Sequence, residues 1–417
     1  MTYVEFFDKT AAENLCACLT YKPERVIYIG GNAKAMNRHI KRYEAVFGAR
    51  GEAVEFLYRA VSRINLQEIV DVLQEIVETY DDCVFDITGG EELYLLALGM
   101  VYAKNPERKL QIHRMNLQSN AVYICDKDGN TIGKELPKLT VEENIQIYGG
   151  DVIYGTVDEE KTYAWEITPE FCEDVDLIWS ICREHARYWN AQIAMFAAVN
   201  AIGTVSEDGL ITVVSKETLT EYLEKNGFWY GVKKSIVKGL LKYGLLTCFD
   251  ESDGMVTIAY KDAQVKRCLT KAGQALEMKV YLIAQSLADE TGALVYDDAK
   301  NGVLIDWDGE WHEDVPNVYD TVNEIDVLLM HGMIPVFISC KNGVITSDEL
   351  YKLWTVAERF GGKYAKRVLV ASSIDFLGEA GEYLRQRAKD MEIRLIENAQ
   401  DLDDVALAAK LKTLWCN

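Results

Sequence analysis

Residues 323–343 read NEIDVLLMHGMIPVFISCKNG, and this stretch decides how the C-terminal third of the chain folds. Two apolar runs, 324–330 and 334–340, are separated by a short break and predict two adjacent strands of one sheet. The first run carries Asp326 near its start, and the second ends at Lys341. Held at the ends of paired strands, an acid and a lysine can form a metal-dependent hydrolytic site, whereas an isolated lysine there is usually only solvated.

Phosphodiester cleavage needs residue types that this stretch supplies. Carboxylates hold Mg²⁺ or Mn²⁺ through oxygen, and the metal activates water. Asp326 is the candidate metal ligand, and Lys341 is the candidate that stabilises developing negative charge. Glu277 is the only acid in the long, mostly apolar helix that begins at 273, and it could be a third acid of the site. Glu324 lies on the same side of its strand as Asp326 and could assist.

The flanking pattern predicts a mixed α/β domain around this motif. The elements expected from the sequence are helices at 273–288, 346–360 and 377–390, and strands at 293–297, 302–307, 324–330, 334–340 and 367–372.

The first 125 residues alternate strand and helix patterns, which is typical of a parallel sheet with helices on both faces. The expected strands are 3–7, 25–30, 52–59, 83–88 and 109–115, and the expected helices are 33–46, 66–80 and 91–104. A hairpin turn signal follows at 125–133.

Three polar or glycine-rich loops follow strands of this predicted sheet, at the edge where such folds bind ligands. Together they favour a ligand that carries phosphate, although each alone could be a tight strand-to-helix turn. No GxGxxG motif is present, which disfavours an ordinary dinucleotide fold. The candidate ligand-binding residues are Asp8, Lys9, Thr10, Gly30, Gly31, Asn32, Thr88, Gly89 and Gly90.

The middle of the chain, from 177 to 275, reads as three helical segments followed by a hairpin, which is the order of a winged helix. Lys234, Lys238 and Lys242 recur every four residues and so share one helix face. In a winged helix this would be the recognition helix. A solvated basic face is the simpler explanation, so nucleic-acid binding by these lysines is a weak prediction.

Composition limits the alternatives. The formal net charge of −22 repels phosphate backbones, so nucleic-acid chemistry would depend on a local groove or a bound metal. Five histidines without a cluster make a zinc site improbable. The N-terminus has no signal-peptide pattern, and no uncharged apolar run reaches the length of a membrane span. The ten cysteines include no CxxC pair and indicate reduced thiols of a cytoplasmic protein.

Three segments, AGQALEMKVYLIA, NEIDVLLMHGMIPVFISCKNG and LYKLWTVAERFGGKYAKRVLVAS, closely resemble the PD-(D/E)xK-type nuclease domain of CARF-domain CRISPR ancillary nucleases. The N-terminal half, with DITGG at 86–90, resembles a CARF domain, a Rossmann-like sensor of cyclic oligoadenylate. The resemblance implies an α/β protein with a CARF domain at 1–150, a linker and winged-helix-like segment at 151–272, and a restriction-endonuclease-like domain at 273–417.

The resemblance also implies roles for individual residues. Asp326 matches the metal-binding Asp, Lys341 the catalytic Lys, and Glu277 the helix acid that precedes them. Ser339 stands where many relatives place the acid of the (D/E)xK pair, so the metal would be held by Asp326, Glu277, the Cys340 carbonyl and the Ser339 hydroxyl. Glu91 and Glu92 follow the TGG where the family often has a lysine.

The sequence therefore predicts a homodimeric endonuclease that is activated by a cyclic oligoadenylate, most simply cyclic tetra-adenylate, and cuts DNA or RNA with Mn²⁺ or Mg²⁺. A two-fold dimer would suit a symmetric cyclic ligand. The alternative is a non-catalytic ligand sensor or regulator with a degenerate nuclease domain, which Ser339 and the Glu91-Glu92 pair favour.

Overall fold

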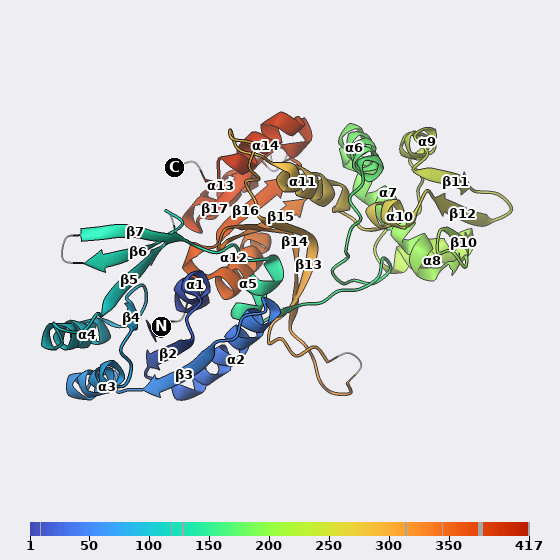
Figure 1. Cartoon of the computed structure of the whole chain (residues 1–417). Coiled ribbons are helices and arrows are strands. Elements are labelled where there is room, and N and C mark those ends of the chain that lie inside the picture. Colours follow the sequence, from blue (N-terminus) through green and yellow to red (C-terminus); the bar gives the residue numbers. More distant parts are fainter. Residues whose placement is uncertain are drawn as a thin grey trace.

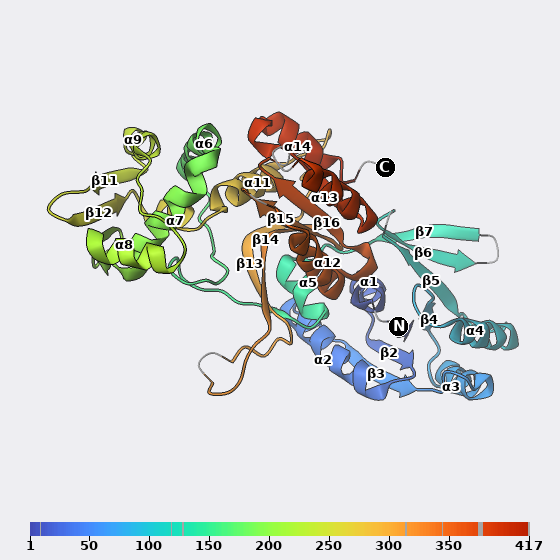
Figure 2. The ribbon, with the colours of Figure 1, turned by 180° about the vertical axis from the view of Figure 1, so that it is seen from behind.

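The structure is a computed structural model that describes residues 1–8, 10–117, 119–126, 129–312, 315–343, 345–373 and 378–415. Within these residues the strands form three sheets of seven, four and six strands. Figure 1 shows the three corresponding regions, and Figure 2 shows them from behind. The mixed α/β class predicted from the sequence is confirmed.

The N-terminal sheet has the strand order β3-β2-β1-β4-β5-β6-β7. The first five of these strands are parallel, and β5, β6 and β7 pair antiparallel. Helices α1 and α2 cover one face, where Leu15 and Tyr43 are buried, while α3 and α4 cover the other with Leu73 and Tyr94. The elements are β1 Thr2–Phe6, α1 Ala11–Tyr21, β2 Arg25–Gly30, α2 Ala33–Ala49, β3 Glu55–Ala60, α3 Leu66–Thr79, β4 Cys83–Asp86, α4 Glu92–Lys104, β5 Gln111–Asn116, β6 Ala121–Asp126 and β7 Gly129–Glu135.

The parallel, helix-covered sheet that the sequence predicts is thus present, and its carboxyl edge carries the predicted loops. The predicted hairpin at 125–133 is also present, because Asp126 lies opposite Gly129 in the antiparallel pairing of β6 with β7. The two turn residues, 127 and 128, lie outside the described residues.

The middle segment has the winged-helix order of helix, strand, two helices and hairpin: α7, β10, α8, α9, β11 and β12. Its sheet is ordered β11-β12-β10-β9. The elements are α6 Pro169–Glu184, α7 Ala186–Ile202, β9 Thr204–Val205, β10 Ile211–Ser215, α8 Lys216–Lys225, α9 Lys234–Lys242, β11 Leu246–Asp250, β12 Met255–Tyr260 and α10 Ala263–Thr270.

Four details of the middle segment differ from the sequence prediction, and two of them are the short strand β9 and helix α10, which were not predicted. The long helix expected from 177 onward is two helices, because His185 leaves the helical conformation with φ −122° and ψ 26°. Neither proline nor glycine marks this break, so the residue pattern does not reveal it. Strand β10 was also missed. It ends at Ser215, which caps α8 by accepting a hydrogen bond from the Thr218 N–H.

The C-terminal sheet is ordered β17-β16-β15-β14-β13-β8. Strands β8, β13, β14 and β15 pair antiparallel, and β15, β16 and β17 pair parallel. The elements are α5 Val141–Ile147, β8 Asp151–Val152, α11 Gln274–Ser286, β13 Asp298–Asp306, β14 Val322–His331, β15 Ile334–Lys341, α12 Ser347–Gly361, the 3₁₀ turn Gly362–Tyr364, β16 Lys366–Ala371, α13 Glu379–Asp390, β17 Ile393–Ile396, the 3₁₀ turn Ala399–Asp401 and α14 Asp404–Lys412.

The predicted central strands and helices of this region are present, but the strand expected at 293–297 is not. Val295 and Tyr296 are buried, which explains the strand-like apolar pattern, yet only an isolated bridge joins Leu294 to Ala288. Strand β17 and helix α14, which complete the sheet and its cover, were not predicted.

The C-terminal sheet lies between the other two regions (Figures 1 and 2). On one side, a hydrophobic cluster joins α1 and α2 to α12 and strand residues such as Phe337. On the other side, a second cluster joins the middle segment to α11 and to residues such as Val336. Strand β8, just past residue 150, pairs with β13 and so ties the N-terminal segment into the C-terminal sheet. Among the described residues, no helix is long and apolar enough to cross a membrane.

Candidate functional site

Strands β14 and β15 bring together the acid and the lysine that the sequence singles out. Their antiparallel pairing places Val327 opposite Ile338, next to Asp326 and Ser339. Asp326 Oδ2 accepts hydrogen bonds from the Cys340 N–H at 2.6 Å and from Ser339 Oγ at 3.1 Å, and it lies 3.7 Å from Lys341 Nζ. The predicted pair is therefore a real contact.

Strand alternation separates the residues around Lys341. Ser339 and Lys341 share one face and line a cavity with Asp326. The Cys340 side chain points to the opposite face and joins the apolar cluster there, where burial raises the pKa of its thiol well above its usual value. Cys340 therefore contributes to this site through its backbone, and its thiol has the environment of a core residue.

Glu277 lies in the first turn of α11, only 4 % exposed, beside the same group. Burial, with a contribution from the nearby Asp326 charge, raises the pKa of Glu277 to about 8. Its Oε2 atom has no hydrogen-bond partner among the described residues and lies 3.7 Å from Lys271 Nζ. Burial also raises the pKa of Asp326. A buried carboxyl group at Glu277 with the charge of the mostly buried Asp326 nearby is unfavourable unless a cation lies near them.

Two lysines supply part of the positive charge that these carboxylates require. Burial works to lower the pKa of Lys341, but the carboxylates of Asp326 and Glu349 outweigh it, and the pKa is raised. The pKa of Lys271 is raised in the same way by Glu277 and Glu324. Both lysines are therefore firmly cationic, and each is shared between two carboxylates.

The cavity at this point has a volume of about 250 Å³ and is closed on one side by the first turns of α12. Glu349 lies there, with Oε2 at 3.2 Å from Lys341 Nζ and Oε1 at 3.3 Å from Lys352 Nζ. Burial works to raise the pKa of Glu349, but Lys341 and Lys352 lower it overall, so this carboxylate is ionised at neutral pH. The sequence reasoning missed Glu349, although an acid eight residues after the lysine, at a helix start, was the available signal.

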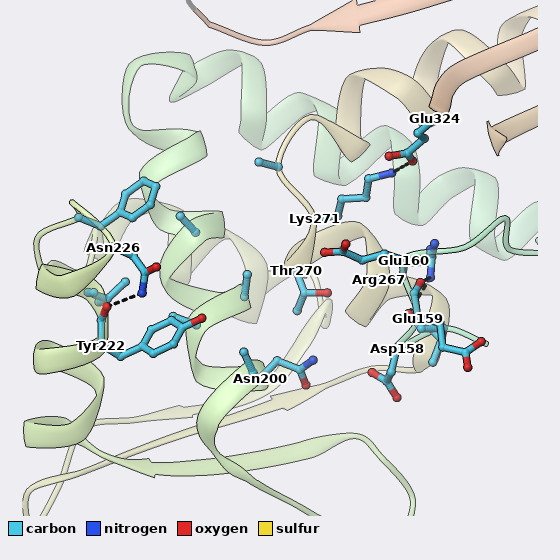
Figure 3. A pocket seen from close by; sticks show the side chains of 18 of the residues that line it. Asp158, Glu159, Glu160, Asn200, Tyr222, Asn226, Arg267, Thr270, Lys271 and Glu324 are labelled. Atoms are coloured by element: carbon cyan, nitrogen blue, oxygen red, sulfur yellow. Dashed lines mark hydrogen bonds and ion pairs between the residues drawn. The ribbon is translucent and has the colours of Figure 1, made fainter. Parts of the chain in front are cut away.

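A second cavity, of about 680 Å³, lies between the middle segment and the C-terminal sheet. Figure 3 shows Lys271 reaching Glu324 at its edge, while Tyr222, Asn226 and Asn200 line the far side. Glu324 lines both cavities, so the large cavity adjoins the Asp326 cavity. Lys271, in the connection before α11, was also missed by the sequence reasoning.

The donor chemistry of the Asp326 site fits a hard divalent cation, because carboxylate oxygens dominate and the Oε2 atom of Glu277 lacks a hydrogen bond. The positions of these carboxylates in the structure fit a metal-binding site less closely. Among the described residues, no three His, Cys, Asp or Glu side chains converge in a way that would hold a metal ion. The carboxylates of this site are instead spread around the two lysines.

The three predicted loops of the N-terminal sheet do come together at its carboxyl edge. The Asp8 loop is fixed to α1, because the Asp8 N–H donates to Asn14 Oδ1 at 2.7 Å and the Thr10 N–H donates to Asp8 Oδ1 at 2.9 Å. Thr88 Oγ accepts a hydrogen bond from the Met115 N–H at 2.6 Å. Lys9, another predicted ligand-binding residue, lies outside the described residues. Asn32 caps α2 by accepting from the Ala35 N–H.

The glycines of these loops pack against their neighbours. A Cβ atom at Gly89 would lie 2.9 Å from Asp8 Cβ, and one at Gly90, where φ is +94°, would lie 2.5 Å from Phe6 Cβ. A Cβ atom at Gly31 would lie 2.7 Å from Nε of Arg63. The chain itself therefore requires Gly89 and Gly90 to be small, whether or not a ligand approaches, whereas the flexible Arg63 side chain could move away from a Cβ atom at Gly31.

Glu91 and Glu92 occupy different environments at this edge. Glu91 pairs with Arg63, with Oε1 of Glu91 at 3.1 Å from Nε of Arg63. Glu92 lies exposed in the first turn of α4. The sheet below holds two buried acids that the sequence reasoning did not single out. Burial raises the pKa of Asp86 to about 7 and, together with the nearby Asp86, raises that of Glu5 well above its usual value.

The lysines of the middle segment lie on the exposed face of α9. Lys234, Lys238 and Lys242 are all exposed, whereas Ile236 and Leu240 pack inward. The shared face is thus present, and it is compatible with solvation as well as with nucleic-acid contact. It lies in the middle segment, apart from the residues around Asp326.

Comparison with known proteins supports the architecture. No protein-family model and no curated protein sequence matches the chain. Among solved structures, protein VC1899 from Vibrio cholerae matches with a TM-score of 0.71 and 16 % identity, covering 99 % of this chain and 97 % of that one. Can2 from Sulfobacillus thermosulfidooxidans, in complex with cyclic tetra-adenylate, matches with a TM-score of 0.62 and 16 % identity over the same shares of both chains.

A type III CRISPR defence DNA nuclease activated by cyclic oligoadenylate matches more weakly, with a TM-score of 0.47 and 15 % identity, over 89 % of this chain and 45 % of that one. The first two matches span nearly all of both chains. Over almost its whole length, the chain therefore has the fold of VC1899 and of Can2, as its sequence resemblance to CARF-domain CRISPR ancillary nucleases predicted.

Proposed function

We propose that this protein is a metal-dependent endonuclease that is activated by a cyclic oligoadenylate and acts in type III CRISPR defence. The observation that carries the proposal is the buried group at the end of β14 and β15. Asp326 and Lys341 lie 3.7 Å apart, and the Oε2 atom of Glu277 lies nearby without a hydrogen bond. A fold that only needed stability would gain little from burying two carboxyl groups together.

The residues suggest how a phosphodiester would be cleaved. Water adds to phosphorus, one P–O ester bond breaks, and the leaving oxygen takes up a proton. A divalent metal ion held by Asp326 and Glu277, with the Cys340 carbonyl, would supply the activated water and offset phosphate charge. The pKa of Lys341 is raised and its side chain is half-buried. This lysine is placed to stabilise negative charge on the phosphate oxygens.

The sensor half of the proposal rests on the N-terminal edge. The Asp8, Gly30 and Thr88 loops meet at the carboxyl end of a parallel sheet, where such folds bind ligands. Can2, which shares the fold, was solved with cyclic tetra-adenylate. We infer that this edge binds the same class of ligand in a homodimer, in which two copies of the edge would face one symmetric ring.

A direct contact offers a connection between the two halves. Thr10, at the sensor edge, precedes α1, and Glu13 in the first turn of α1 is almost fully buried. Glu13 Oε1 lies 2.6 Å from Lys363 Nζ and accepts a hydrogen bond from Tyr364 Oη at 2.5 Å. Lys363 and Tyr364 follow the end of α12, whose first turn carries Glu349 beside Lys341. We infer that α1 and α12 transmit the ligand signal to the Asp326 cavity.

The alternative is a non-catalytic sensor with a degenerate nuclease domain. One observation favours it: among the described residues, no three potential ligand side chains converge as a metal site. The two functions differ in a simple experiment. Full-length protein is incubated with Mn²⁺, with cyclic tri-, tetra- or hexa-adenylate, and with labelled DNA and RNA, alongside an Asp326→Asn variant.

The proposal expects cleavage that requires both Mn²⁺ and one of the cyclic ligands, and that Asp326→Asn abolishes. Ligand-induced thermal stabilisation without any cleavage would instead establish the sensor alternative. The choice between DNA and RNA follows from which labelled substrate is cut.

A further inference from the structure

The most informative unassigned group is Glu349, which faces the Asp326 cavity from the opposite side. It lies in the first turn of α12, whereas Asp326 and Lys341 lie on the sheet. The cavity of about 250 Å³ is lined by Asp326, Ser339 and Lys341 on one side and by Glu349 and Lys352 on the other. Glu349 is therefore an acid of the same cavity, although it is distant from the strand motif in sequence.

The geometry around Lys341 shows how close the two acids lie. Lys341 Nζ contacts Asp326 Oδ2 at 3.7 Å and Glu349 Oε2 at 3.2 Å. One ammonium group thus bridges the two carboxylates. A divalent cation that bound between them would satisfy the same two charges, and it would free Lys341 to face a phosphate.

Ser339 explains why a further acid, beside Asp326 and Glu277, is needed from elsewhere. Its side chain faces the cavity, but its hydroxyl donates to Asp326 Oδ2 at 3.1 Å and carries no charge. An acid at position 339 would add a carboxylate to the face that holds Asp326 and Lys341. Because Ser339 stands there, that face lacks this carboxylate. Glu349 reaches the same cavity from the helix, with its Oε2 atom 3.2 Å from Lys341 Nζ.

Building on the proposed function, we propose that Glu349 is a metal ligand of the cleavage site and that it supplies, from helix α12, the carboxylate that position 339 lacks. The ion pair of Glu349 with Lys341 is then the metal-free arrangement of two groups that separate when the metal binds. A purely structural Glu349 would instead serve only to restrain Lys341 and cap the start of α12.

The test measures Mn²⁺ binding to the full-length protein without nucleic acid, by electron paramagnetic resonance of free Mn²⁺ and by calorimetry. Four variants are compared with the wild type: Asp326→Asn, Glu349→Gln, Asp348→Asn and the double variant Ser339→Glu/Glu349→Gln. Asp348 is exposed on the same helical turn, so Asp348→Asn removes an equal charge outside the cavity. Glutamine keeps the size of Glu349, and circular dichroism verifies that each variant folds.

The proposal expects Glu349→Gln to weaken Mn²⁺ binding at least about tenfold, Asp348→Asn to leave it unchanged, and Ser339→Glu to recover it in the Glu349→Gln background. Wild-type affinity in Glu349→Gln, with a loss in Asp326→Asn, would overturn the role of Glu349 and leave the proposed function standing. A failure of Ser339→Glu to recover binding would overturn the replacement of position 339. Equal affinity in the wild type, Asp326→Asn and Glu349→Gln, or no binding at all, would overturn the proposed metal-dependent function as well.

Discussion

The two candidate sites of this chain differ in how far the fold itself accounts for their residues. At the N-terminal edge, Gly89 and Gly90 are small because Asp8 and Phe6 leave no room for a side chain. At the C-terminal cavity, burial raises the pKa of both Glu277 and Asp326, and the Asp326 charge raises that of Glu277 further, so these carboxyl groups gain little from packing. The comparison teaches that a glycine motif can be explained by folding alone, whereas a cluster of buried charged groups is not explained by folding and indicates a function.

The largest effect is expected at the cavity. Lys341→Ala should lower cleavage on the order of 10²-fold or more, because the remaining groups cannot replace its charge next to the phosphate. Cleavage of labelled nucleic acid with Mn²⁺ and cyclic tetra-adenylate measures it. Lys389→Ala, which removes an exposed cation from α13, is the matched control and should behave like the wild type. Cleavage by Lys341→Ala at the control's rate would show that this cavity is not the active site.

The next largest effect is a pH dependence of stability at the N-terminal edge. The Asp86 carboxyl keeps its proton up to about pH 7 in the folded protein, whereas an unfolded Asp loses it near its ordinary pKa. Between these values the unfolded chain binds fewer protons, so the free energy of unfolding should fall with rising pH, by on the order of 4 kcal/mol. Above pH 7 this contribution is fully lost.

Asp86→Asn carries no titrating proton at this position, so its stability should decline less between pH 5 and pH 8 than that of the wild type. Chemical denaturation at a series of pH values measures the difference. Glu5 still contributes in the variant, so part of the decline should remain. An identical decline in both proteins would mean that Asp86 does not hold a proton in the folded state.

Gly89 distinguishes folding from ligand binding at the same edge. A methyl group there would push on Asp8 Cβ, so Gly89→Ala should destabilise the protein by about 1–3 kcal/mol and weaken cyclic tetra-adenylate binding at the same time. Thermal melting and calorimetry measure the two effects. Gly48→Ala, on α2 with open space around it, is the control and should not be destabilising. Weaker ligand binding at unchanged stability would contradict the packing explanation and indicate direct ligand approach at Gly89.

The smallest effect concerns the connection between the sites. Glu13→Gln removes the charge that pairs with Lys363, so it should reduce the ratio of activated to basal cleavage by about 2- to 30-fold. Affinity for the cyclic ligand should stay unchanged, because Glu13 faces the C-terminal domain. The exposed Glu44→Gln on α2 serves as the control. An unchanged activation ratio would mean that the signal does not pass through this contact.

The sequence predicted these sites unequally, and the reasons are physical. Strand alternation and pairing follow from residue pattern, so the Asp326–Lys341 contact and the meeting of the three N-terminal loops could be predicted. Glu349 and Lys271 were missed, because tertiary packing brings a helix and a connection up to Lys341 and Glu277, and the spacing of Glu349 after Lys341 was only a weak local signal. The break at His185 and strand β17 were missed for the same reason, since tertiary contacts decide them.

The central claim is that ligand binding at the N-terminal edge switches on metal-dependent cleavage at Asp326. The most direct measurement is the initial rate of cleavage of labelled nucleic acid by the full-length protein with Mn²⁺, with and without cyclic tetra-adenylate, for the wild type and Asp326→Ala. The account predicts that the wild type cleaves rapidly only with the ligand, and that Asp326→Ala or excess EDTA abolishes this cleavage although Asp326→Ala still binds the ligand. Undiminished cleavage by Asp326→Ala, or a wild-type rate that the ligand does not change, would contradict it.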